Sequence, residues 1–319
     1  MNTATGVQPW IVLHADDFGM NAAVNAGIVQ AFRDGLLTST SILANAPAVS
    51  NACAAWPLLM AELREGAIPS ATIRRQAGDS LRPFDLGVHL NLTQGRPLTA
   101  NYPAELLGDQ GQFPGIGLVF RKLRSERSQF RQAVLHELQA QIERVQALGV
   151  APTHLNGHQY VEMVPEVASL IPDLAAKYSI PIVRLAKEGC LARTVLGQGR
   201  VISFAVALVK RYFAGRFQQQ IEREGLVAPS RFFGTSHAGQ VDKSTLIKFL
   251  TFASPSGCTE IGLHPGVAAI ESPLVTDAWH DPLAVARPAE LEWLCDISTC
   301  GLFSNHGLRL GRLTDLLSV

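Results

Sequence analysis

Two adjacent carboxylates, Asp16 and Asp17, follow a short apolar run at residues 11–13. Neighbouring side chains of a buried strand point to opposite faces, so we expect this pair at the strand's C-terminal end, where both can face a cleft. Two carboxylates this close repel each other unless a cation lies between them or one keeps a proton. The pair therefore predicts a site that combines a metal ion with a base. The alternative is that the two acids only cap the following helix, although Asn21 could cap it alone.

Three histidines stand where further groups of such a site are expected. His89 lies on a predicted strand, and His158 and His264 each lie at the end of another. Because the carboxyl ends of parallel strands meet at one end of a barrel, these side chains and the two acids can converge there. Two histidines and an aspartate with an open position suit a divalent metal ion that activates water. We expect no role in this site for the histidines that lack such a setting, which are His14, His136, His154, His280 and His306.

The elements that must position these side chains alternate between strand and helix. Apolar and β-branched runs predict strands at residues 11–13, 38–43, 85–92, 153–156, 180–185 and 260–264. Helical spacing of apolar residues predicts helices at 21–34, 49–63, 130–148, 164–178 and 290–300. Polar or Gly/Pro-rich stretches predict loops at 69–83 and 102–117. Such alternation without an internal repeat is typical of a parallel, barrel-like α/β fold.

Composition excludes several other classes of protein. The 319 residues suit one α/β barrel domain over residues 1–319, and 47% hydrophobic residues can form a large core. Basic and acidic residues balance at 27 each, which gives no general attraction to nucleic acid. The five cysteines are scattered without a CxxC pair, which predicts a reduced, cytoplasmic setting. Neither a signal-peptide pattern nor an apolar run near the ~20 residues of a membrane span is seen.

Residues 201–221 have an unusual composition. An apolar run at 201–209 is followed by basic residues and by the aromatic residues Tyr212, Phe213 and Phe217. One interpretation is an ordinary helix packed on the barrel. The other is an amphipathic helix, within a helical insertion at about 190–232, that makes peripheral contact with the inner face of a membrane.

Several short segments together resemble a known family. They are HADDFG at 14–19, LLTSTS at 36–41, GVHLNL at 87–92 with GRP at 95–97, HLNGH at 154–158 and EIGLHPG at 260–266. In this order the chain resembles the YdjC/ChbG family of carbohydrate deacetylases, and most closely its hopanoid-biosynthesis-associated HpnK branch. The resemblance implies a distorted parallel (β/α) barrel of the polysaccharide-deacetylase type. It also implies metal-dependent removal of an acetyl group from an N-acetylated amino sugar.

The resemblance also implies roles for individual residues. Asp17, His89 and His158 match the family's metal ligands, for one divalent ion such as Mg or Zn. Asp16 matches the general base, and His264 matches the proposed general acid. A divalent ion lowers the pKa of bound water and polarises the acetyl carbonyl, Asp16 takes the water's proton, and a histidine protonates the leaving amine.

Other positions concern the substrate. Asn45 and Arg184 lie at predicted strand ends and are expected to bind sugar hydroxyls, with packing of loops as the alternative. His237 lies in a segment, 232–242, that looks like the hopanoid branch, and it is either a substrate-shaping residue or a structural loop histidine. Tyr160 stands where many family members have a second histidine, so a ligand or substrate contact of the family is missing there.

The residues and the resemblance together predict a hydrolase that removes the N-acetyl group of an N-acetylglucosamine-type sugar, and the resemblance alone implies that this sugar is carried by a hopanoid glycolipid. One alternative is a deacetylase of soluble chito-oligosaccharides, or an esterase with the same centre. A second is a sugar-binding barrel without activity, against which the complete set of acids and histidines argues. The apolar helix at 290–300 is either core or the interface of a homodimer.

Overall fold

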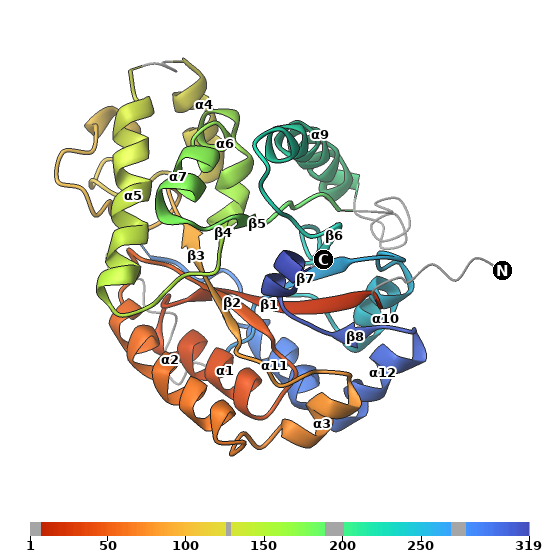
Figure 1. Ribbon diagram of the computed structural model, residues 1–319. Helices are drawn as coiled ribbons and strands as arrows, with labels where there is room; N and C mark the ends of the chain where they lie inside the picture. Colours follow the sequence, from red (N-terminus) through yellow and green to blue (C-terminus); the bar gives the residue numbers. More distant parts are fainter. Residues whose placement is uncertain (1–7, 126–128, 189–200, 269–278, 319) are drawn as a thin grey trace.

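The structure is a computed structural model that describes residues 8–125, 129–188, 201–268 and 279–318 (Figure 1). Its strands are β1 (Trp10–Phe18), β2 (Ser39–Ile42), β3 (Asp85–Leu90), β4 (His154–Gly157), β5 (Ile182–Val183), β6 (Arg231–Phe233), β7 (Cys258–Leu263) and β8 (Arg309–Leu310). They form one parallel sheet in the order β5-β4-β3-β2-β1-β7-β6, with β8 paired to β1.

The sheet curls toward closure between its two edges. Isolated parallel bridges join Ile182 to Val227 and Glu188 to Phe232, so the chain around β5 reaches the segment that contains β6. Around this curve β1 to β5 follow one another in sequence order, and β6 and β7 return to β1. The expected α/β barrel is therefore confirmed, as a distorted half-barrel of parallel strands.

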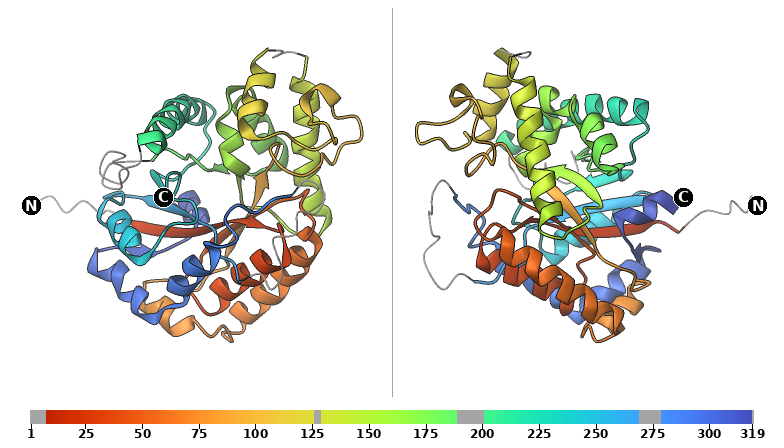
Figure 2. Two further views of the ribbon diagram at one scale, coloured as in Figure 1. Left: turned by 180° about the vertical axis from the view of Figure 1, so that it is seen from behind. Right: turned by 60° about the vertical axis from the view of Figure 1, so that its left-hand side comes forward.

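Helices cover the outside of the half-barrel (Figures 1 and 2). The first group is α1 (Ala22–Arg33), α2 (Val49–Arg64), α3 (Ala71–Gln76), α10 (Lys243–Thr251), α11 (Arg287–Cys295) and α12 (Cys300–Asn305). The second group is α4 (Ile116–Ser125), α5 (Arg131–Ala147), α6 (Pro165–Ala168), α7 (Ile171–Tyr178) and α9 (Val201–Arg223). Short 3-10 turns are η1 (Ala104–Leu106), η2 (His158–Met163), η4 (Ile297–Thr299) and η5 (Leu313–Ser318). The second group stands at the end of the molecule opposite α1 and α3 in all three views.

The central strand β1 separates two kinds of interior. Ile11, Leu13 and Ala15 belong to the large core between the sheet and the helices. Trp10 and Val12 belong to a separate small cluster with Ile182, Cys258 and Leu313. Since side chains alternate along a strand, positions 10 and 12 face the inside of the barrel, and so do positions 14 and 16.

His14 therefore lies on the same face of β1 as Asp16. We expected His14 to have no part in the site, and its position beside Asp16 differs from that expectation. It is fully buried, with Nδ1 2.9 Å from Oγ of Ser39 and Nε2 3.1 Å from Oγ of Ser41. The barrel is thus apolar at the start of β1 and polar toward its end.

Three predicted elements differ from the structure. The loop expected at 69–83 contains α3, whose Arg74 is fully buried and pairs with Asp79 at 2.9 Å, a tertiary contact that no local pattern shows. The helix expected at 164–178 is divided into α6 and α7, because a proline near the start of α7, Pro172, lacks the N–H that a continuous helix needs.

The third difference concerns the helix expected at 290–300. It runs from Arg287 to Cys295, because Asp296 leaves the helical conformation and its side chain accepts a hydrogen bond from the backbone N–H of Ser298. A new 3-10 turn and α12 follow. Predicted strands also shift at their ends, and β1 continues through both acids to Phe18.

Candidate active site

An irregular end of β1 brings the two adjacent acids to one cavity. The pairing of β1 with β2 shifts register between Ala15 and Phe18, and Asp17 has a positive φ of 72°. In a regular strand the two side chains would face opposite sides. Here both Asp16 and Asp17 line the same pocket, because the backbone turns between them. A strained non-glycine residue of this kind is typical of functional sites.

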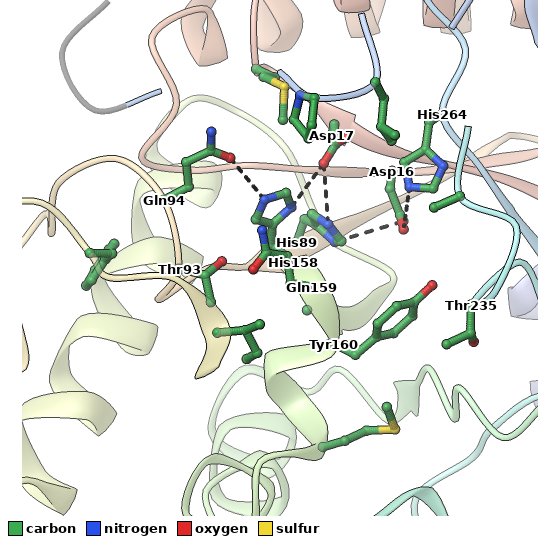
Figure 3. Close-up of a pocket in the computed structure, with 18 of the residues that line it drawn as sticks. Asp16, Asp17, His89, Thr93, Gln94, His158, Gln159, Tyr160, Thr235 and His264 are labelled. Atoms are coloured by element: carbon green, nitrogen blue, oxygen red, sulfur yellow. Dashed lines mark hydrogen bonds and ion pairs between the residues drawn. The ribbon is translucent and has the colours of Figure 1, made fainter. Parts of the chain in front are cut away.

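Asp17, His89 and His158 form a cluster that could hold a cation (Figure 3). Oδ1 of Asp17 lies 3.1 Å from Nδ1 of His158 and 3.7 Å from Nε2 of His89, and one ligand atom from each residue lies within 4.8 Å of the others. This oxygen is buried and accepts no well-formed hydrogen bond from the described residues. A carboxylate and two imidazoles fit a divalent ion of the zinc or first-row transition-metal type.

Hydrogen bonds orient each of these candidate ligands. Nε2 of His158 lies 3.1 Å from Oε1 of Gln94, which leaves Nδ1 to face Asp17. Nδ1 of His89 lies 2.7 Å from Oδ1 of Asn156, which leaves Nε2 free for a cation. Rotating the Asn156 amide would instead let its nitrogen donate to Nδ1 of His89. A neutral histidine that binds a metal through Nε2 must donate from Nδ1, so a bound cation selects the first orientation.

A different arginine neutralises each acid. Nη2 of Arg287 donates to Oδ2 of Asp17 at 2.8 Å, and Nη1 of Arg184 donates to Oδ2 of Asp16 at 2.8 Å. Burial alone would raise the pKa of both carboxyl groups, but the arginines and neighbouring histidines hold both pKa values far below the usual range. Both acids are therefore ionised at neutral pH.

Asp16 has the contacts of a positioned base. Nε2 of His14 lies 3.3 Å from its Oδ1, and Nε2 of His264, at the end of β7, lies 4.0 Å from its Oδ2. Arg184 also donates to Glu260 at 2.8 Å, so its guanidinium is fixed between two carboxylates. His264 is held through its backbone N–H, which donates to Glu290 at 2.5 Å.

The cavity has a polar end and an apolar wall. Its volume is about 790 Å³, and both acids, His89, His158 and His264 line one part. The remaining part is mostly apolar, with Phe113, Ile116, Phe120, Met163, Val164 and Phe213. Tyr160 and Gln159 line the space between, both with positive φ, 62° and 52°. Such a cavity suits a ligand with a polar reacting group and an apolar remainder.

The structure brings together five of the eight predicted site residues: Asp16, Asp17, His89, His158 and His264. The other three do not line the cavity. The amide of Asn45 donates to the backbone carbonyls of Gln94 and Arg96, at 3.1 and 3.0 Å, which matches the loop-packing alternative.

Arg184 and His237 are buried next to the cavity lining without belonging to it. The guanidinium of Arg184 is fully buried and holds Asp16 instead. His237 is buried, with Nδ1 4.0 Å from Glu188 and its ring edge against Phe249, which matches a structural histidine.

The supporting residues that were not predicted include His14, Gln94, Asn156 and Arg287. The first three lie within or next to the motifs, so their position along a strand or its following loop was the available signal. Arg287 comes from the start of α11, 270 residues after the acid that it contacts, and no sequence pattern connects the two.

Known proteins are similar to this chain in sequence and in fold. The model of the YdjC-like protein family matches residues 10–300. A carbohydrate deacetylase of Geobacillus stearothermophilus is 34% identical over 56% of this chain and 61% of its own length, and one from Vibrio cholerae is 30% identical over 56% and 60%. The chain thus spans about three fifths of these bacterial relatives.

Two further similarities extend over more of the molecule. A human carbohydrate deacetylase is 30% identical over 82% of this chain and 76% of its own length. The crystal structure of a proposed cellobiose-phosphate cleavage protein from Enterococcus faecalis V583 has the same fold, with a TM-score of 0.68 and 20% identity over 97% of this chain and 99% of that one. The motifs, the half-barrel and the match over residues 10–300 show that this chain belongs to the YdjC-like family.

Proposed function

We propose that this protein is a carbohydrate deacetylase that removes the N-acetyl group from an N-acetylglucosamine-type sugar by metal-dependent hydrolysis. The observation that carries the proposal is the convergence of one Asp/His/His cluster with a second, separately held carboxylate and a histidine in a single cavity. The names of the similar proteins, carbohydrate deacetylases, support the same reaction.

Each side chain of the cavity has a separate task in this reaction. Asp17, His89 and His158 would hold the ion, and when bound it supplies a Lewis acid that polarises the acetyl carbonyl and acidifies water. Asp16 takes the proton of the attacking water, for which Arg184 keeps it ionised and oriented. His264 faces Asp16 across 4.0 Å and protonates the leaving nitrogen. The collapse of the tetrahedral adduct then releases acetate and the amine.

We further propose that the sugar is carried by an apolar lipid, of the hopanoid type. The six apolar side chains of the cavity wall support an apolar aglycone, because a chito-oligosaccharide would leave them without a matching surface. The hopanoid itself rests on the resemblance to the HpnK branch.

An acetate-release assay tests both parts. Purified protein is given N-acetylglucosaminyl hopanoid or N,N′-diacetylchitobiose, with and without a chelator, beside the Asp16→Asn variant. We expect chelator-sensitive acetate release from the lipid substrate that the variant loses. Equal or greater release from chitobiose would contradict the lipid, and release that survives chelation and Asp16→Asn would contradict the proposed mechanism.

A further inference from the structure

Two helices of the second group, α4 and α9, form the outer side of the apolar cavity wall. Phe120 of α4 and Phe213 of α9 both line the cavity, and their rings meet edge to face at 5.4 Å. The two helices stand at the same end of the molecule in every view (Figures 1 and 2). The apolar part of the cavity therefore lies directly beneath this pair.

Exposed apolar groups continue this wall to the surface. The ring of Tyr212 contacts that of Phe213 at 5.3 Å, and Tyr212 is 61% exposed. Leu118, which precedes Phe120 on α4, is 39% exposed. Phe217, by contrast, is buried in the core, so it cannot be the membrane-facing group that the sequence suggested. Among the described side chains of α9, from residue 211 onward, the exposed aromatic ring is that of Tyr212.

The same two helices carry an excess of positive charge. Residues 116–124 and 211–221 contain five basic residues and no acidic one, in a chain whose charges balance. Lys122 and Arg211 each donate to a backbone carbonyl, of Leu107 and Glu188. The others, Arg121, Arg124 and Arg216, are exposed. We call Leu118, Arg121, Arg124, Tyr212 and Arg216 the α4–α9 rim.

We propose that the α4–α9 rim docks the protein on the surface of an anionic lipid bilayer. Cationic side chains around a partly exposed tyrosine and leucine match the chemistry of a negatively charged headgroup layer over hydrocarbon. Docking at this place would set the apolar wall of the cavity against the membrane. That advantage rests on the proposed lipid-linked substrate, but the docking itself is measured without turnover.

Vesicle co-sedimentation of the full chain tests the proposal. The wild type is mixed with vesicles of phosphatidylcholine alone or with phosphatidylglycerol, at low and high salt. We expect binding to the anionic vesicles that falls as salt rises. Arg121→Glu/Arg216→Glu should weaken it by more than about tenfold, since each basic residue near such a surface contributes on the order of 1 kcal/mol.

A matched control carries the same change of charge elsewhere. The control is Arg64→Glu/Arg75→Glu, whose two positions are exposed on α2 and α3 at the opposite end of the molecule. This variant should bind anionic vesicles as the wild type does. Equal loss in both double variants, or no binding by the wild type, would overturn the proposal. So would a change in oligomeric state on size exclusion that accompanies Arg121→Glu/Arg216→Glu, because the rim would then be a contact between two copies.

Acetate release from a soluble N-acetylated sugar distinguishes a failure of membrane docking from a failure of the proposed deacetylase function. A rim variant that no longer binds vesicles but keeps this activity supports docking and does not contradict the proposed deacetylase function. A wild type that binds vesicles but releases acetate from neither soluble nor lipid-linked sugar would overturn the deacetylase and leave docking standing.

Discussion

Glu162 offers a quantitative test of the buried electrostatics around the site. It lies in η2, four residues after His158, and is 2% exposed. Neither carboxyl oxygen has a hydrogen-bond partner among the described residues. Burial raises the pKa of Glu162 to about 8, although the positive charge of Arg184 opposes the shift. The folded protein therefore keeps this carboxyl protonated at neutral pH.

The raised pKa makes stability depend on pH with a definite sign. In the unfolded chain the group loses its proton near 4.5, and in the folded chain near 8. Its neutral form is fully compatible with burial below pH 4.5, and stability is lost as pH rises from there to 8. The difference between about 8 and 4.5, at about 1.36 kcal/mol for each pKa unit, corresponds to about 5 kcal/mol.

Glu162→Gln removes this titration while keeping the shape of the side chain. We expect the variant's advantage over the wild type to grow by about 1.4 kcal/mol for each pH unit between about pH 5 and 8. Urea unfolding at pH 5.5, 7 and 8.5 measures it, with the exposed Glu65→Gln as the control. Parallel pH profiles for the wild type and Glu162→Gln would refute the reasoning, because Glu162 would then be ionised or hydrated in the folded protein.

Three further predictions concern the site itself. Asp17→Asn should lose bound metal and activity together, whereas Asp16→Asn should keep the metal and lose activity by about 10²–10⁴-fold. Metal content is measured by inductively coupled plasma emission spectroscopy, and activity by acetate release. If the two variants behave alike, the proposed division of roles between the two acids is wrong. Arg184→Met should destabilise folding by about 3–5 kcal/mol in urea, because Asp16 and Glu260 lose their shared countercharge, and an unchanged midpoint would contradict the pairing. Phe213→Ser should raise KM for the lipid-linked sugar and leave KM for a soluble sugar unchanged. Equal changes of KM for both sugars would show that the apolar wall does not bind the lipid part of the substrate.

The polar residues at strand ends could be predicted because they depend on local rules. Alternating strands and helices imply parallel strands, and parallel strands bring their carboxyl ends together. That reasoning located His158 and His264 without knowledge of any contact. It could not decide between binding and packing for Arg184, since the answer depends on a carboxylate 168 residues earlier in the chain. Arg287 was beyond reach for the same reason.

Strand interiors were predicted less well than strand ends. We expected no role for His14 because its side chain points opposite to those of its neighbours in the first strand, and β1 in fact continues through both acids to Phe18. Once the strand is extended, simple alternation places His14 beneath Asp16. The alternation rule therefore holds, and the predicted strand was too short to show that Asp16 shares the face of His14.

The sequence suggested that the adjacent acids at the end of β1 either share a proton or hold a cation between them. The structure shows a different electrostatic arrangement. Neither a shared proton nor a single cation between them is required, because Arg184 neutralises Asp16 and Arg287 neutralises Asp17. The positive φ of Asp17 turns the backbone between them, so each carboxylate has one oxygen on its own arginine and the other toward histidines. Two ionised groups can then sit side by side with different tasks. Asp17 presents Oδ1 to His89 and His158, and Asp16 stays ionised because the guanidinium of Arg184 balances its charge, which suits Asp16 to the proposed role of base.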